Sequence, residues 1–162
     1  MKIRHFLLLV VVLVSSWIVG CAPARSGMDY ASEGGRGEVT GEMSGVEFSA
    51  VIEIGPNRDY ISVEYLSPTS LCGLMLTAKG EECEVKLGEV SFTCDTREVE
   101  GFLRPVTAFL PQEQANTVQK EGENTVMTFP VGGTLILSPT GDPISLSRGD
   151  IEVRVVWWER GK

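Results

Sequence analysis

The chain has 162 residues, a hydrophobic content of 43%, 18 glycines, 8 prolines and a formal net charge of −8. This length fits one domain, and the hydrophobic content is that of a globular protein and excludes a disordered chain. The acidic balance excludes the basic surface that nucleic-acid binding requires, so we expect no nucleic-acid partner.

Residues 1–20 predict a secretory signal peptide. Lys2 and Arg4 precede an unbroken apolar run at residues 6–14, and the segment from Phe6 to Gly20 is shorter than the roughly 20 residues that span a bilayer. Removal of this segment takes away Lys2 and Arg4 but no acidic residue, so the net charge changes from −8 to −10. The mature chain is therefore more acidic than the precursor.

The signal segment ends in Ile18-Val19-Gly20-Cys21, which resembles the lipobox of bacterial lipoproteins. The resemblance implies that a diacylglyceryl group is attached to the thiol of Cys21 and that a signal peptidase cuts between Gly20 and Cys21. Two or three acyl chains would anchor the protein stably, at the outer face of the cell membrane or at the outer membrane. The alternative is an uncleaved membrane anchor in which Cys21 has no role.

Residues 21–45 predict the lipidated N-terminus followed by a flexible tether. They are rich in glycine, serine and glutamate and show little apolar periodicity, and the glycines at residues 34–41 are interpreted as part of this tether. An antiparallel β domain is expected over residues 46–160, because apolar and polar residues alternate there and turn residues separate the runs.

The strands are predicted from this alternation. In the first of them Phe48 and Ile52 share the buried face, and in the last one Val153, Val155 and Trp157 do. In chain order the predicted strands are residues 46–54, 60–66, 71–78, 83–87, 90–94, 124–131, 133–138, 143–146 and 151–159.

Residues 99–110 break the alternation and predict one short helix. Phe102, Val106 and Phe109 recur at helical spacing, while Gly101 and Pro105 weaken the pattern. The apolar stripe of this helix would pack on the inner face of the sheet.

Residues 83–94 predict a β-hairpin whose two-residue turn is Gly88-Glu89. This register places Val85 opposite Phe92 and Cys83 opposite Cys94, all on one buried face. The two cysteines are either joined by a disulfide, which a secreted location permits, or remain two buried thiols, and Cys72 is a rival partner. No metal site is expected, because the cysteines lack the close C-x₂₋₄-C spacing of zinc sites.

No catalytic motif is present. His5 leaves with the signal peptide, so the mature chain has no histidine, which excludes Ser-His-Asp triads and deprives a cysteine nucleophile of its usual base. The chain also lacks the glycine-rich motifs that bind nucleotide phosphates. We therefore expect no enzyme and no cofactor.

These features together resemble the LolA/LolB-type fold of lipoprotein carriers. The resemblance covers residues 46–159 and rests on the lipobox, the strand order, the mid-chain helix and the closing run Gly-Asp-Pro-Ile-Ser-Leu with its terminal tryptophans. It implies a mostly β protein whose antiparallel sheet is curved into an unclosed half-barrel, with one short helix packed on its inner face. It also implies that the protein binds a lipid or acyl chain.

The expected function is that of a membrane-anchored extracytoplasmic lipoprotein that binds an apolar ligand and has no catalytic activity. The alternative is an envelope-assembly or surface protein–protein interaction module with a filled core, whose partner is unknown. The inner-face residues either line an apolar space between sheet and helix or form a closed core. They are Phe48, Ile52, Val63, Val85, Phe92, Phe102, Phe109, Val153 and Val155.

Overall fold

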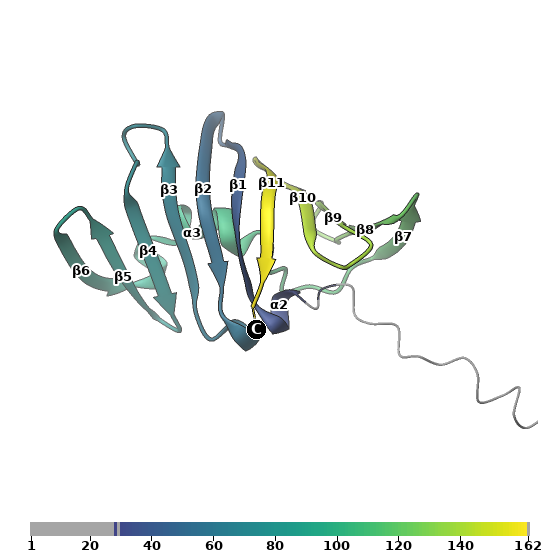
Figure 1. Ribbon diagram of the computed structural model, residues 1–162, viewed down its shortest axis with the longest axis horizontal. Coiled ribbons are helices and arrows are strands. Elements are labelled where there is room, and N and C mark those ends of the chain that lie inside the picture. The colour runs from purple at the N-terminus through teal and green to yellow at the C-terminus, as the bar shows by residue number, and fades with distance from the viewer. Residues whose placement is uncertain (1–27, 29, 162) are drawn as a thin grey trace, which may run out of the picture.

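The computed structural model describes residue 28 and residues 30–161. The predicted signal peptide, with Gly20 and Cys21, lies outside the described residues. Figure 1 shows a broad, curved antiparallel sheet with the described C-terminal end near its middle. No described helix is long and apolar enough to cross a membrane.

The sheet has 11 strands in the order β6-β5-β4-β3-β2-β1-β11-β10-β9-β8-β7. The strands are β1 (Gly35–Met43), β2 (Val46–Ile54), β3 (Ile61–Ser67), β4 (Leu74–Lys79), β5 (Glu82–Leu87), β6 (Val90–Asp95), β7 (Thr117–Glu121), β8 (Asn124–Thr128), β9 (Thr134–Leu137), β10 (Pro143–Arg148) and β11 (Ile151–Arg160). The described helices are α2 (Tyr30–Glu33), α3 (Glu100–Thr107) and the 3-10 turns η1 (Pro56–Arg58) and η2 (Thr96–Glu98).

The sheet consists of two meanders that meet at the pair β1–β11. The first six strands run outward from β1 as a meander, the chain crosses back through α3, and strands β7 to β11 return as a second meander until β11 pairs with β1. The two edge strands β6 and β7 do not meet, so the half-barrel is unclosed. The predicted mostly β, antiparallel, half-open fold is confirmed.

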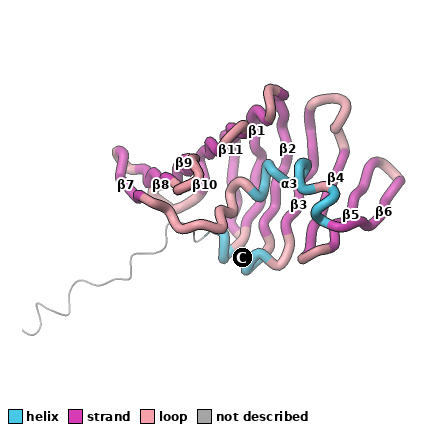
Figure 2. The backbone as a smooth tube through the Cα atoms, turned by 180° about the vertical axis from the view of Figure 1, so that it is seen from behind, coloured by secondary structure: helices cyan, strands magenta, loops and turns pink. Residues whose placement is uncertain are grey.

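Helix α3 packs on the inner face of the sheet, as predicted. It lies mainly against β3 and β2, with a smaller contact to β11. Figure 2, which views the molecule from the side opposite to Figure 1, shows the helix lying across these strands. Leu103 and Val106 are buried in this contact, and the hydroxyl of Tyr65 donates a hydrogen bond of 2.9 Å to the carbonyl oxygen of Phe102. The helix therefore covers the central strands of the sheet.

The prediction that residues 21–45 form a tether is wrong for residues 30–43. These residues form α2 and β1, and β1 is a central strand that pairs with β2 on one side and β11 on the other. The sequence hides this strand because its inner face reads Gly35, Gly37, Val39, Gly41 and Met43, in which glycine replaces the apolar side chains that mark a strand. The folded domain therefore begins before residue 46.

A β-bulge reverses the expected roles of the two tryptophans on β11. Glu38 pairs with Trp157 but Val39 pairs with Val155, so Val156 is an extra residue that shifts the alternation. Trp157 is therefore exposed and not inward as predicted, and its indole N–H donates to a carboxylate oxygen of Glu38 at 3.1 Å.

Trp158 occupies the inner face instead and packs over the glycines of β1. Its ring centroid lies 5.9 Å from that of Tyr30, in an edge-to-face contact. A Cβ atom on Gly35 would lie 2.5 Å from the Trp158 indole, and one on Gly37 would lie 2.6 Å from it. The indole of Trp158 therefore packs directly against the backbone of β1, where these glycines leave room for it.

Candidate functional site

Six of the nine predicted lining residues lie in the hydrophobic core. Phe92 and Phe102 do not, because their side chains are 56% and 41% exposed, and Val155 is half-buried. The interpretation of a closed core fits the six buried residues, which pack with Leu103 and Val106 of α3. They are Phe48, Ile52, Val63, Val85, Phe109 and Val153.

A hollow lies beside α3, on the face of the helix that carries Gly101 and Arg104. It is a groove of about 890 Å³ between α3 and the turns that join β8 to β9 and β10 to β11. Its apolar floor is formed by Ala108, Leu110 and Ile151, and Val131 stands exposed at its rim. The remaining lining residues are Arg97, Glu100, Gly101, Arg104, Thr107, Gln112, Arg148 and Gly149.

Helix geometry explains how α3 contributes to this groove. Residues Gly101, Arg104 and Ala108 follow one another at spacings of three and four and therefore share one face of the helix. Leu103 and Val106 lie on the opposite face, against the sheet. Gly101 leaves the groove open, since a Cβ atom placed there would find no atom within 4 Å.

Three arginines surround the groove, and each is paired with a carboxylate. Arg97 contacts Asp95 at 2.6 Å and Arg148 contacts Glu113 at 3.8 Å. Hydrogen bonds from Arg97 lower the pKa of Asp95 to about 2. An anionic ligand at this rim would therefore have to share these arginines with the carboxylates of Asp95 and Glu113.

The third arginine, Arg104, joins α3 to the β10–β11 turn. Its Nη1 donates to a carboxylate oxygen of Asp150 at 3.0 Å, its Nη2 donates to the other oxygen, and the Ser44 hydroxyl donates to the same carboxylate. The bonds from Arg104, followed by that from Ser44, hold the pKa of Asp150 well below its usual range. The two bonds to Asp150 use two of the five N–H donors of the guanidinium, so Arg104 has donors to offer a ligand.

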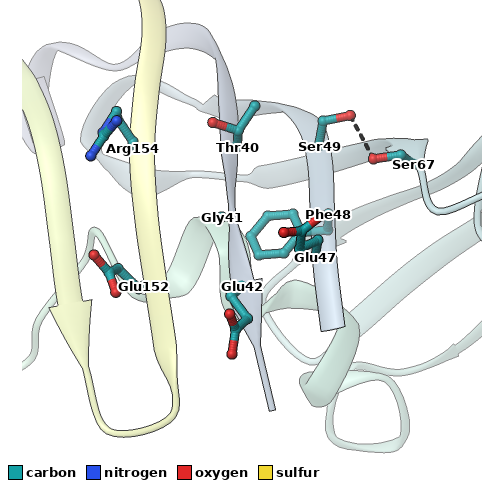
Figure 3. Close-up of a pocket in the computed structure, with 9 residues that line it drawn as sticks. All are labelled: Thr40, Gly41, Glu42, Glu47, Phe48, Ser49, Ser67, Glu152 and Arg154. Carbon is teal, nitrogen blue, oxygen red and sulfur yellow. Dashed lines mark hydrogen bonds between the residues drawn. The ribbon is translucent and has the colours of Figure 1, made fainter. Parts of the chain in front are cut away.

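A second hollow of about 450 Å³ lies on the outer face of the central strands (Figure 3). In the strand register Glu42 stands between Glu47 of β2 and Glu152 of β11. In the next row Thr40 stands between Arg154 and Ser49, and the Ser49 hydroxyl lies 2.8 Å from that of Ser67. Phe48 is the one large apolar side chain that lines this hollow, and it is itself buried, while the other side chains are polar or charged and include three glutamates, which disfavour an acyl chain.

The predicted pairing of the hairpin cysteines is confirmed, but the predicted burial holds only for Cys83, because Cys94 lies on the edge strand β6 and is half-buried. Cys83 and Cys94 are opposite each other on β5 and β6, and both are free thiols, as is the exposed Cys72. Burial, and then the neighbouring Cys94, raise the pKa of Cys83. A disulfide between Cys83 and Cys94 stays a prediction.

Within the described part of the chain, no group of three or more His, Cys, Asp or Glu side chains could hold a metal ion. Sequence reasoning missed the groove and its arginines altogether. Arg97 lies in the 3-10 turn η2 and Arg104 in helix α3, seven residues later, and Arg148 and Asp150 flank the glycine of a turn. These spacings were the available signal, but only the fold brings the two segments together.

Comparisons with known proteins support the fold and no more. No protein-family model matches the chain, and a search of curated proteins finds no match. An uncharacterized conserved protein from Thermus thermophilus matches with a TM-score of 0.55 and 15% identity over 84% of each chain. This likeness shows a shared fold.

Two other solved structures match more distantly. A LolA superfamily protein from Nitrosomonas europaea has a TM-score of 0.38 and 12% identity over 86% of this chain and 77% of its own. A structure of PNGF-II has a TM-score of 0.38 and 8% identity over 80% of this chain and 28% of its own.

Proposed function

We propose that the protein is a membrane-anchored extracytoplasmic lipoprotein that binds a lipid or acyl chain and catalyses no reaction. The groove beside α3 carries this proposal. Its volume of about 890 Å³ falls within the range of ligand-binding sites, roughly 300–1,000 Å³. The apolar surface that the groove offers to an alkyl chain is mainly that of Val131, which is 70% exposed, since Ala108, Leu110 and Ile151 at the floor are already buried, and covering exposed apolar surface is favourable.

The arginines at the rim narrow the ligand to an amphiphile with an anionic group. A fatty-acid carboxylate or a lipid phosphate can accept hydrogen bonds from a guanidinium in the same bidentate way as an aspartate. Arg104 and Arg148 stand at the rim while the floor is apolar, so a head group and a chain can be accommodated together. This location is the outer side of α3, not the space between helix and sheet that the sequence suggested.

The anchor half of the proposal rests on the lipobox and on the short distance between Cys21 and the domain. Tyr30 is fully buried, and its hydroxyl donates a hydrogen bond of 2.5 Å to the carbonyl oxygen of Phe109. Residues 22–29 can therefore span at most about 29 Å when fully extended. A lipidated Cys21 would keep the α2 end of the domain close to the membrane.

The ligand groove is tested with Gly101→Trp, a variant that fills it from the open face of α3. We expect wild-type protein to take up cis-parinaric acid, a fluorescent fatty acid, and Gly101→Trp to bind it at least tenfold more weakly. Titration of the fluorescence measures the affinity, and a thermal melt checks that the variant is folded. Gly101→Ala is the matched control. Like Gly101→Trp, it replaces glycine with a residue of higher helix propensity, but its small side chain leaves the groove open. Equal affinity of Gly101→Trp and Gly101→Ala, or no uptake by the wild type, would contradict the proposal.

The anchor is tested with Cys21→Ser. We expect this variant to accumulate as unprocessed precursor and to incorporate no radiolabelled palmitate, because the acceptor thiol is gone. Cys72→Ser is the control and should be labelled and processed like the wild type. Labelling of Cys21→Ser at the wild-type level would show that the lipobox interpretation is wrong, whatever the result for the groove.

A further inference from the structure

Strand β6 ends the sheet, and no strand of the described residues pairs with its outer edge. The β5–β6 hairpin pairs Leu87 with Val90 around a two-residue turn, and Gly88 has the positive φ of +61° that such a turn requires. In a hairpin of this register the backbone groups of residues 90, 92 and 94 bond to β5. The N–H and C=O groups of Ser91 and Thr93 therefore point outward from the sheet.

This edge lacks the features that usually prevent strand association. The pairing of β6 with β5 is regular, without a bulge, and residues 90–94 contain no proline and no charged side chain. Val90 and Phe92 are 66% and 56% exposed. The opposite edge, β7, carries Lys120 and Glu121 beside its own exposed valine, Val118. The two edges thus differ in that the charge of β6 is confined to its last residue, Asp95, whereas β7 carries two adjacent charged side chains.

We propose that β6 is a dimerisation site at which two copies of the chain pair antiparallel, with Phe92 at the twofold axis. The proposal is independent of the ligand groove, which lies beside α3 and the turns of the other wing. It deepens the alternative of a protein–protein interaction module by naming the edge and the partner.

The register of such a pair follows from the outward backbone groups. With Phe92 opposite Phe92 of the second copy, Ser91 of each copy faces Thr93 of the other. Each of these two pairs exchanges two backbone hydrogen bonds, which makes four in total. Val90 then faces Cys94 of the second copy on the inner face. The two Phe92 rings form a non-hydrogen-bonded pair, the arrangement in which facing side chains lie closest.

Charge limits where a second copy can bind. Without residues 1–20 the chain carries a net charge of −10, which opposes contact between two copies over most of the surface, whereas residues 90–94 of β6 carry no charge and add no repulsion of their own. In the Phe92-centred register Glu89 faces Asp95 of the second copy. Asp95 is paired with Arg97 at 2.6 Å, so this contact is not between two bare carboxylates.

The dimer is tested in the full-length chain in its membrane by cysteine cross-linking. Val90→Cys combined with Cys83→Ser places a thiol opposite Cys94 of the second copy. Diamide then oxidises the two thiols to one disulfide and is itself reduced by the two electrons and two protons. We expect a covalent dimer on a non-reducing gel, with mass spectrometry identifying the bond between residues 90 and 94.

Proline substitutions separate the edge from nonspecific contact. Ser91→Pro removes an outward N–H and leaves the bonds to β5 in place, so it should reduce the cross-linked fraction at least fivefold. Val118→Pro makes the same change on the β7 edge, where the register with Met127 also turns the N–H outward, and should have no effect. Val118→Cys with Cys83→Ser should give no dimer.

A cysteine-free measurement guards against misfolded variants. Sedimentation velocity of the detergent-solubilised wild type should give a dimer at micromolar concentration, and Phe92→Lys should give a monomer with an unchanged melting temperature. A wild-type monomer at all concentrations, or a cross-linked dimer that persists in Ser91→Pro, overturns the proposal. Loss of dimerisation with retained fatty-acid binding, or the reverse, shows which of the two proposals has failed.

Discussion

A chain that begins at residue 46 should fail to fold, although the apolar alternation begins there. Such a chain lacks α2 and β1, and β1 is the strand that joins the two meanders through β2 and β11. It also lacks Tyr30, which packs against Trp158 and donates a hydrogen bond to the Phe109 carbonyl. We expect low chemical-shift dispersion in an amide NMR spectrum and no cooperative thermal transition.

The matched control for this truncation is a chain that begins at residue 28. It keeps α2 and β1 and lacks only residues outside the described domain, so it should give a dispersed spectrum and a cooperative transition. If both truncated chains fold with the same melting temperature, β1 contributes nothing to the sheet and the strand order described above is wrong.

Replacement of Gly35 with alanine should lower the free energy of unfolding by about 1–3 kcal/mol, the usual cost of overpacking a core. The new Cβ atom would lie 2.5 Å from the Trp158 indole and 2.9 Å from the carbonyl oxygen of Glu159, so the ring or the strand must move. Urea denaturation followed by circular dichroism measures the change.

A double-mutant cycle with Trp158→Ala identifies the indole as the cause. In that background Gly35→Ala should cost less than in the wild type, leaving only the contact with the Glu159 carbonyl. Gly101→Ala is the control, since its Cβ atom meets no atom within 4 Å, and it should leave stability unchanged or raise it by up to about 1 kcal/mol. The same cost for Gly35→Ala in both backgrounds would contradict the proposed role of Trp158.

Elements whose sequence carries an apolar period were predicted well. Strand β2 and the β5–β6 hairpin alternate with period two, and α3 carries its stripe at helical spacing despite Gly101 and Pro105. The pairing of Cys83 with Cys94 followed from the turn alone, because a two-residue turn determines every pair in a hairpin. In each case the signal is local and lies within one element and its nearest neighbour.

Strand β1 and the tryptophans show where local patterns are insufficient. The inner face of β1 is largely glycine because Trp158 fills the space above it, and Trp158 is inward only because Val156 forms a bulge. The glycines of β1 leave room for the Trp158 indole, and the bulge on β11 turns the indole towards them. The sequence of β1 alone does not reveal the indole, and the sequence of β11 alone does not reveal the bulge. A glycine-rich strand has no apolar period, so it resembles a tether in sequence.

The sequence by itself determined the fold class, the course of the second to sixth strands, the hairpin register and the single helix on the sheet, because period and turn residues act over short distances. It also supports the prediction of the lipid anchor, which a local motif carries. Only the tertiary structure decided that the domain starts at α2, that Arg104 and Arg148 meet at one groove, and that β6 is an open edge. These features depend on which segments become neighbours, and that is set by packing across the whole sheet.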